Sequence, residues 1–259
     1  MSINKSRCIA VIGAGPAGIF AARELAKNDH KVTLLNRDIK PGGLAEYGIY
    51  PTKYKIKDGL RKQFYSTIAD ENISYFGNIL VGDNSGISIN DLRMLGFDAI
   101  LVTTGAQGTK WLGLPGEDLI GCYHAKDLVY HYNLLPPFSN HEYKIGKKVA
   151  IIGVGNVMMD IARYLITEKD VEMVTAIARR GPAEVKFTRK ELEYIVKNLD
   201  MDNYLAEIER VSGLMNSLGQ NPYESVKFIR EAFPNAEETN SDSIFRIKFL
   251  ASQIGRAHG

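Results

Sequence analysis

The stretch "CIAVIGAGPAGIFAAREL", residues 8–25, joins an apolar run to a glycine-rich turn and then to a helical pattern. Arg7 to Ile12 has the composition of a buried strand, and Pro16 to Asn28 that of a helix. "KVTLLN", from Lys31 to Asn36, follows as a second apolar strand. Strand, turn, helix and strand in this order predict a βαβ unit.

The turn itself, "GAGPAG", has the spacing of a dinucleotide-binding loop. Gly13 permits the tight turn, Gly15 allows backbone to approach a pyrophosphate, and Gly18 allows the helix to pack closely on the strand. The N-terminus of the helix adds N–H groups and a positive dipole. A purely structural turn is the alternative, but the βαβ context favours a nucleotide site at Gly13, Gly15, Pro16, Ala17 and Gly18.

A second stretch, "VAIIGVGNVMMDIAR", repeats the pattern at residues 149–163. Gly153 and Gly155 keep the first two roles, but the third glycine position is Met158, a bulky side chain where helix and strand pack. Two such turns predict two nucleotides bound by one chain.

The residue that ends the second strand of each unit indicates which nucleotide is bound. An acid there normally binds the ribose hydroxyls. The first unit has Asn36, which can still bond a hydroxyl without charge, so a lower affinity is expected. The second unit has "VTAIARR", ending in Arg179 and Arg180. Guanidinium groups bind a 2′-phosphate that a carboxylate would repel, so these residues indicate NADP(H); a solvated basic pair is the alternative.

Composition excludes several classes of protein. The 259 residues are 45% hydrophobic and 24% charged, as in soluble globular proteins. Lysine plus arginine (32) nearly balances aspartate plus glutamate (30), so no nucleic-acid partner is expected. Cys8 and Cys122 form no CxxC or zinc spacing. The charge-free run Cys8 to Ala22 is too short for a membrane span, and we expect a cytoplasmic protein.

The remaining pattern predicts an α/β fold with two Rossmann-like, three-layer dinucleotide-binding domains. Expected strands after the first βαβ unit are residues 73–76, 78–82 ("NILVG"), 97–106 ("FDAILVTTGA", buried), 147–152, 173–180 and 244–250. Expected helices are residues 53–70, 125–134, 153–167 and 188–199, with further helix in 200–240.

Five segments in a fixed order carry a resemblance to a known family. They are "GPAG" (15–18), "GGLAEYGI" (42–49), "LGLPGEDLIG" (112–121), "GVGNVMMDIAR" (153–163) and "ARRGPAEVKFTRKEL" (178–192). In this order they resemble the adrenodoxin-reductase type of ferredoxin–NADP reductase. The resemblance covers most of Arg7 to Leu192, and "RRGP…FT.KEL" is its most specific part.

This resemblance implies an FAD-binding domain, at residues 1–106, followed by an NADPH-binding domain, at 107–259. It implies an oxidoreductase that passes a hydride from NADPH to FAD and then single electrons to a ferredoxin- or adrenodoxin-like iron–sulfur protein. A flavin suits this task because it takes up a pair of electrons and releases them singly. The family's chains continue well beyond this sequence, so we expect the NADPH domain to be incomplete at its C-terminal end.

The resemblance also assigns cofactor contacts by motif. For FAD it implies the turn Gly13 to Gly18, Asn36 near the ribose, Gly43 and Leu44 of the "GGL" loop, Val81, and Thr104, Gly105 and Ala106 beside the flavin. For NADPH it implies Gly153, Val154, Gly155, Asn156 and Val157 at the pyrophosphate, Arg179 and Arg180 at the 2′-phosphate, and Glu191 at the far side of the nucleotide. It leaves the catalytic side chains unknown.

Three departures from the family pattern stand out. Asn36 replaces the usual glutamate, and Met158 replaces a small residue. Lys53, in "PTKY", replaces the histidine of a "PDHP" segment near the flavin, so a role for that histidine is not expected to carry over.

Some features have simpler explanations than function. His124, Asp127 and His131 share a helical face, but no fourth ligand accompanies them, and we expect no metal. Thr188 and Glu191 form a capping box, so Glu191 is explained equally by capping and by nucleotide contact. The basic stretch 53–62 fits a solvated helix face better than a surface that docks an acidic ferredoxin.

Three hypotheses remain at this stage. The first is the NADPH-dependent flavoprotein described above. The second is the related glutamate-synthase small-subunit type, which usually has cysteine clusters ahead of its first turn, where this chain has only Cys8. The third is a truncated dinucleotide-binding remnant without catalysis. A disulfide reductase is disfavoured because no CxxC is present.

Overall fold

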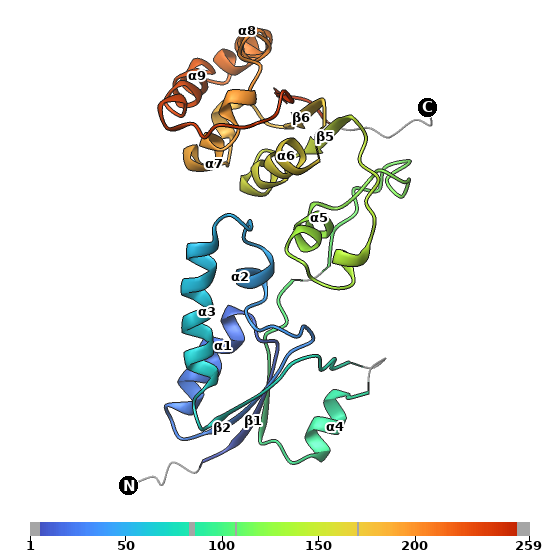
Figure 1. Cartoon of the computed structure of the whole chain (residues 1–259), viewed down its shortest axis with the longest axis vertical. Helices are drawn as coiled ribbons and strands as arrows, with labels where there is room; N and C mark the ends of the chain where they lie inside the picture. Colours follow the sequence, from blue (N-terminus) through green and yellow to red (C-terminus); the bar gives the residue numbers. More distant parts are fainter. Residues whose placement is uncertain (1–5, 83–85, 107, 170, 253–259) are drawn as a thin grey trace. The chain divides into compact units, whose positions relative to one another are not determined.

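The chain folds into two units, each built on a parallel β-sheet (Figure 1). The structure, a computed structural model, describes residues 6–82, 86–106, 108–169 and 171–252. The first unit comprises Met1–Thr109 and Val129–His141, and the second comprises Lys110–Leu128 and Glu142–Gly259. The α/β class with parallel sheets that the sequence predicts is therefore confirmed.

The sheet of the first unit has the strand order β3-β2-β1-β4, with all neighbours parallel. Its strands are β1 (Cys8–Ile12), β2 (Lys31–Leu35), β3 (Ile73–Phe76) and β4 (Ala99–Val102). Its helices include α1 (Pro16–Ala26), α2 (Leu44–Tyr47), α3 (Tyr54–Ile68) and α4 (Ile89–Met94), and α5 (Ala125–Tyr132) includes residues of both units.

Alternating side chains of β1 bury both faces of this sheet. Ile9 and Val11 pack in one cluster with residues of α1 and α3, such as Ile19 and Phe64. Ala10 and Ile12 pack on the opposite face, in the cluster that contains Leu92 of α4. Figure 1 shows α1 and α3 on one side of β1 and β2 and α4 on the other. Strands buried on both faces are the reason why β1 is almost continuously apolar.

The sheet of the second unit has the order β5-β6-β7, again parallel. Its strands are β5 (Lys148–Ile152), β6 (Met173–Ile177) and β7 (Ile244–Lys248). Its helices are α6 (Asn156–Glu168), α7 (Arg189–Glu193), α8 (Met201–Ser217) and α9 (Tyr223–Arg230), apart from its share of α5. Single 3₁₀ turns lie at Pro182–Glu184, Val196–Asn198 and Phe233–Asn235 in this unit, and at Phe138–Asn140 in the first unit.

The two units begin with the same backbone arrangement. Ile12 pairs with Leu35, and Ile152 pairs with Ile177, each at the end of the first strand pair of its unit. The N–H group that follows then closes both turns: Gly13 donates to the Leu35 carbonyl at 2.7 Å, and Gly153 donates to the Ile177 carbonyl at 2.9 Å. The repeat seen in the sequence is therefore a repeat of hydrogen-bond register.

Two expected strands differ from the prediction. "NILVG" is not a strand, because Asn78 adopts a left-handed φ of 58° that turns the chain away from β3, and Val81 makes only an isolated bridge to Ile87. The strand in "FDAILVTTGA" is not buried. Among the described residues it is the edge strand β4, and Leu101 and Val102 are 38% and 56% exposed.

Two further boundaries also differ. The strand expected to end at Arg180 ends at Ile177, so both arginines follow β6 in a bend. The helix expected over residues 188–199 is interrupted at Ile195, whose φ of −138° and ψ of 5° are not helical. Ile195 and Val196 are both fully buried, so packing against the core outweighs the helical pattern at this point.

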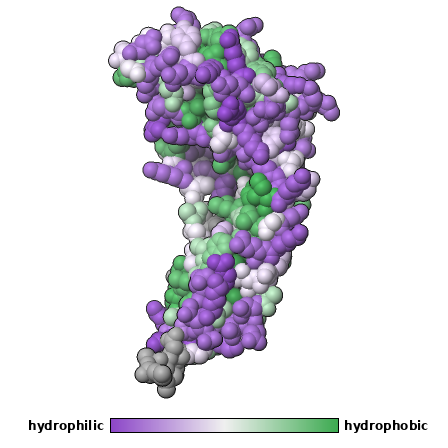
Figure 2. Space-filling view, turned by 90° about the vertical axis from the view of Figure 1, so that its left-hand side faces the viewer, coloured by the Kyte–Doolittle hydropathy of each residue, from purple (hydrophilic) through white to green (hydrophobic). Residues whose placement is uncertain are grey.

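Figure 2 shows hydrophilic residues over most of the face in view, with apolar residues exposed among them. No helix within the described ranges is long and apolar enough to cross a membrane.

A buried carboxylate, that of Glu207, ties α8 to the end of β7. Its oxygens accept from Arg210 at 2.6 and 2.8 Å and from the Phe249 N–H at 2.7 Å, and Lys248 lies 3.2 Å away. Burial alone raises the pKa of Glu207, but these partners outweigh it and hold the pKa below its ordinary value. The folded state is therefore stabilised by the ionised form.

We predict that Glu207→Gln lowers the free energy of unfolding at neutral pH by about 2 kcal/mol, because bonds to a charged acceptor are lost. A depressed carboxyl pKa stabilises the fold above the unfolded value, about 4.3, and this contribution is lost as the pH falls through the folded value. Urea unfolding from pH 7 to pH 3 should show the two proteins converging at the acid end. The exposed Glu224→Gln is the control, and a constant difference at all pH values would contradict the assignment.

Candidate dinucleotide-binding sites

The first turn is packed without spare room. Gly13 has φ of +106°, and a Cβ atom there would lie 2.6 Å from the carbonyl oxygen of Thr103. A Cβ atom at Gly18 would lie 1.9 Å from the Gly13 oxygen and 2.7 Å from Thr103 Oγ1. Both glycines are therefore required by close approach of α1, β1 and the end of β4, as their spacing predicts.

The middle glycine of this turn faces open space. Gly15 is the N-cap of α1, no side chain caps the helix, and no atom lies within 4 Å of a Cβ placed on it. The "GGL" loop lies close to Gly15, because a Cβ atom at Gly43 would lie 3.1 Å from Gly15 Cα. The loop therefore forms a wall of the turn. An uncapped helix N-terminus with open space beside it fits a pyrophosphate.

The other residues predicted to contact FAD lie in three places. Asn36 follows β2 and the segment Thr104 to Ala106 follows β4, so the parallel strands bring both to the edge of the sheet that carries the turn. Leu44 begins α2 and is 60% exposed. Val81 packs against the cluster of Ala10 and Ile12 beneath the sheet.

Two residues that build the first turn were missed by the sequence analysis. Thr103 Oγ1 donates to the carbonyl oxygens of Ile12 (3.0 Å) and Gly13 (2.8 Å), and the Gly42 N–H donates to the Ala14 carbonyl at 2.7 Å. Gly42 was visible as the first glycine of "GGL". No sequence signal identified Thr103, since its role depends on β4 pairing with β1.

The second turn is more open than the first. Gly153 has φ of +123° and Gly155 is the uncapped N-cap of α6, but nothing lies within 4 Å of a Cβ atom at either. Met158 is 4% exposed at the third glycine position. Because β5 is an edge strand in the described sheet, no neighbour like β4 crowds this turn, and a bulky residue is accommodated.

A returning segment after β6 is bonded to the second turn. The Lys186 N–H donates to the Val154 carbonyl at 3.0 Å, and Asn156 Oδ1 accepts from the Thr188 N–H at 2.8 Å. Val157, in the first turn of α6, is 54% exposed. The segment that follows the arginines is thus placed beside the glycine turn.

The predicted 2′-phosphate residues lie on the surface near this segment. Arg179 and Arg180 are exposed directly after Ala178, which holds the register position of Asn36. Arg180 Nε lies 3.8 Å from Glu184, a loose ion pair that leaves its guanidinium accessible. Glu191 lies in α7, and its N–H donates to Thr188 Oγ1 at 3.4 Å. The Thr188 side chain therefore caps the helix, as the capping box predicts.

Two cations of the basic stretch 53–62, Lys57 and Arg61, are bonded within their own unit. Lys57 is 7% exposed, its Nζ donates to Asn133 Oδ1 at 2.9 Å, and burial lowers its pKa. Arg61 forms a two-point bond with Glu46, at 2.6 and 2.7 Å, and also reaches Asp58. Two of the cations of this stretch therefore stabilise the fold around the "GGL" loop and do not form a free basic surface.

The histidines of α5 and its start have other contacts. The ring of His124 lies edge-on to Trp111, with centroids 4.5 Å apart, and His131 Nδ1 is 3.1 Å from the Phe138 carbonyl. Within the described part of the chain, no cluster of three or more His, Cys, Asp or Glu side chains could hold a metal ion.

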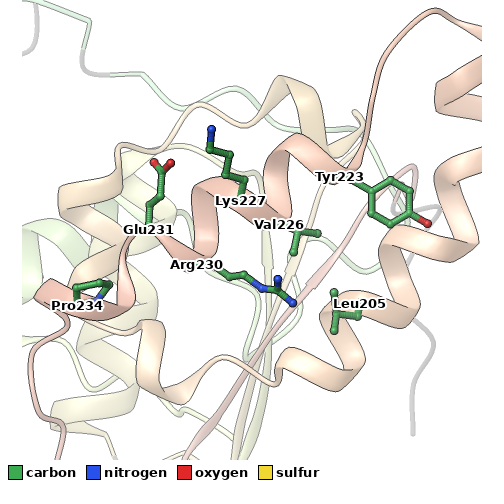
Figure 3. Close-up of a pocket in the computed structure, with 7 residues that line it drawn as sticks. All are labelled: Leu205, Tyr223, Val226, Lys227, Arg230, Glu231 and Pro234. Carbon is green, nitrogen blue, oxygen red and sulfur yellow. The ribbon is translucent and has the colours of Figure 1, made fainter.

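A hollow in the second unit lies away from these residues. It has a volume of about 750 Å³ and is lined by Leu205, Tyr223, Val226, Lys227, Arg230, Glu231 and Pro234. Figure 3 shows Arg230 extending toward Leu205, whereas Lys227 and Glu231 point to the other side of α9. None of the predicted cofactor residues lines this hollow, so we do not place a nucleotide there.

Fold and turns together define a protein with two dinucleotide-binding units of Rossmann type. The chain belongs to the pyridine nucleotide-disulphide oxidoreductase family, which matches residues 7–214. Cys8 and Cys122, both described, form no disulfide with each other.

The chain is similar to two reductases and to a solved structure of one of them. NADPH-ferredoxin reductase FprA of Mycobacterium tuberculosis (strain ATCC 25618 / H37Rv) is 30% identical over 277 residues, which cover 95% of this chain and 59% of FprA. Mitochondrial NADPH:adrenodoxin oxidoreductase of Salvelinus fontinalis is 32% identical over 232 residues, or 81% of this chain and 46% of that protein. The structure of Mycobacterium tuberculosis FprA in complex with NADPH has a TM-score of 0.77 at 28% identity, covering 98% of this chain and 62% of FprA.

These comparisons confirm the resemblance that the motifs indicate. The chain spans about three fifths of the length of FprA.

We predict that Gly18→Ala destabilises the first unit by about 2–3 kcal/mol, because the added methyl group meets backbone that cannot move away cheaply. The matched control is Gly59→Ala in the middle of α3, where nothing lies within 4 Å of the new Cβ. That change should stabilise the helix by about 0.5–1 kcal/mol. Thermal and urea unfolding of both variants test the packing, and equal effects of the two alanines would contradict it.

Proposed function

We propose that the chain is the two-nucleotide part of an FAD-dependent oxidoreductase that passes a hydride from NADPH to FAD and then single electrons to an iron–sulfur protein. The observation that supports this most directly is the repeated turn: two uncapped helix N-termini, closed by the same hydrogen bond in the same register. When bound, the flavin supplies the conversion of an electron pair into single electrons, and the protein supplies binding and orientation.

The first unit, near residues 1–106, is proposed to hold FAD. Gly13, Gly15, Pro16, Ala17 and Gly18 place the helix N-terminus at the pyrophosphate. The "GGL" loop, with Gly43 and Leu44, forms one wall, and Thr104, Gly105, Ala106 and Val81 complete the proposed set of contacts. Asn36 lies beside the turn, where its side chain accepts from the Ala14 N–H. No side chain is assigned a catalytic role.

The second unit, within residues 107–259, is proposed to hold NADPH. Gly153, Val154, Gly155, Asn156 and Val157 surround the pyrophosphate at the start of α6. Arg179 and Arg180 follow β6, where they are exposed to a 2′-phosphate, and Glu191 of α7 lies in the segment that returns to the turn.

The proposed electron acceptor is a ferredoxin- or adrenodoxin-like protein, as the names of the relatives suggest. The cytoplasm remains the predicted compartment. A glutamate-synthase-like role and a nucleotide-binding remnant without catalysis are the alternatives, and the experiment below separates the remnant from the enzyme.

The purified chain should be mixed with FAD and its visible spectrum recorded without oxygen, before and after NADPH. Flavin bands in stoichiometric amount that bleach on addition of NADPH would support the proposal, and subsequent reoxidation by a ferredoxin would extend it to the acceptor. A chain that binds NADPH but no flavin would support a binding protein. A chain that binds neither nucleotide would refute the proposal.

We predict that Arg179→Gln combined with Arg180→Gln weakens NADPH binding about tenfold or more, since two charge-assisted contacts to phosphate are lost. Binding of NADH should change little, because NADH has no 2′-phosphate. Arg230→Gln, an exposed arginine of the same unit, is the control. Isothermal titration calorimetry measures all three, and an equal loss for NADPH and NADH would show that the arginines do not contact the 2′-phosphate.

A further inference from the structure

Asn36 is buried and fully engaged with the chain itself. It is 7% exposed and directly follows β2. Its Oδ1 accepts from the Ala14 N–H at 3.1 Å, and its Nδ2 donates to the carbonyl oxygens of Asp38 (2.7 Å) and Lys40 (3.1 Å). Tyr75 Oη is 3.4 Å from the same Nδ2. Both amide protons are therefore committed to backbone carbonyls of the next loop.

The loop after Asn36 is held at three consecutive carbonyls. Asn36 binds those of residues 38 and 40, and the Tyr75 hydroxyl donates to the Ile39 carbonyl between them at 2.9 Å. The loop then reaches Gly42, whose N–H donates to the Ala14 carbonyl at 2.7 Å. The Ala14 N–H is thus bonded to Asn36, and the Ala14 carbonyl is bonded to Gly42, in the loop that Asn36 holds.

This loop carries the wall of the first turn. Gly43 follows Gly42 and approaches Gly15 so closely that a Cβ on Gly43 would lie 3.1 Å from Gly15 Cα. A shift of residues 38–42 would therefore move the wall beside the open space at Gly15, where the pyrophosphate is proposed to bind.

We propose that Asn36 is a positioning residue, which holds the loop 38–43 against the first glycine turn, and that it is not a ligand of the ribose. This inference rests on the proposed function only for the identity of the nucleotide. A carboxylate cannot donate hydrogen bonds, so the acid expected at this position would face two carbonyl oxygens without a proton between them. Asparagine is required here by the loop.

The role has a consequence for specificity. Ala178 holds the equivalent register position in the second unit, and it has no polar side chain. The Asn36 side chain likewise offers the ribose no free amide proton and no charge, and Arg37, which follows it, is paired with Asp38 at 3.0 Å. The first site should therefore recognise its nucleotide through the pyrophosphate and be insensitive to the adenosine 2′-hydroxyl.

The test uses the isosteric variant Asn36→Asp, which keeps an acceptor for the Ala14 N–H but loses both donors. The matched control is Asn198→Asp in the second unit, because Asn198 Nδ2 also donates to two backbone carbonyls, those of Ser241 and Ser243, at 2.9 and 3.0 Å. Hydrogen exchange of the Gly42 amide, measured by NMR without nucleotide, should be about tenfold faster or more in Asn36→Asp and unchanged in Asn198→Asp.

A second measurement covers the case in which Asn36→Asp does not fold. In the wild-type chain, the Nδ2 protons of Asn36 should exchange at least about tenfold more slowly than those of an exposed asparagine, because both are bonded inside the fold. Exchange at the solvent rate, or an unchanged Gly42 amide in a folded Asn36→Asp, would overturn the proposal.

Nucleotide binding separates this inference from the proposed function. The wild type should bind FAD and its 2′-deoxyadenosine analogue within about twofold, and Asn36→Asp should weaken both about tenfold. If Asn36 were a ribose ligand, the wild type would prefer FAD, and the aspartate would strengthen that preference. If the wild type binds no FAD, the proposed function fails, while the exchange of the Gly42 amide still decides the role of Asn36.

Discussion

The close approach of backbone at the first glycine turn is the constraint on which the first unit depends. A Cβ atom at Gly18 would lie only 1.9 Å from the carbonyl oxygen of Gly13, and Thr103, just after β4, closes the same space. Three elements, β1, α1 and the end of β4, can meet there only because Gly13 and Gly18 have no side chains. Their meeting leaves the N-terminus of α1 uncapped at the edge of the sheet, and an uncapped N-terminus is the feature that attracts a phosphate group.

The second unit has the same register but a different packing environment. Its turn is closed by the equivalent hydrogen bond, yet no strand crowds Gly153 in the described sheet, and Met158 takes the place of the third glycine. Comparison of the two turns distinguishes glycines that set the path of the backbone from a glycine that only allows close packing. The first two glycines keep the path of the backbone the same in both units, whereas the third serves packing that can vary.

Hydrogen bonds within the protein determine which polar residues remain available to a ligand. The resemblance places Asn36 near a ribose, and Lys57 and Arg61 belong to the basic stretch 53–62, for which a solvated helix face was expected in preference to a docking surface. In the structure their polar atoms bind the chain itself, and Lys57 is buried while doing so. Arg179 and Arg180, by contrast, remain exposed beyond β6. Buried polar groups need partners inside the protein, so the buried side chains of Asn36 and Lys57 are not available to a ligand.

The sequence by itself determined the α/β class, the two turns, most strands and the family, because glycine spacing and runs of apolar residues are local patterns. Only the tertiary structure decided which strand lies at the edge of a sheet and which hydrogen-bond partner each polar side chain has. Leu101 and Val102 look like buried strand residues, but they are exposed because β4 has a described neighbour on one side only. Asn36 looks like a weakened ribose ligand, but its amide binds a loop whose path no local pattern indicates. Strand pairing and side-chain partners join residues that are distant in sequence, and only the folded chain brings them together.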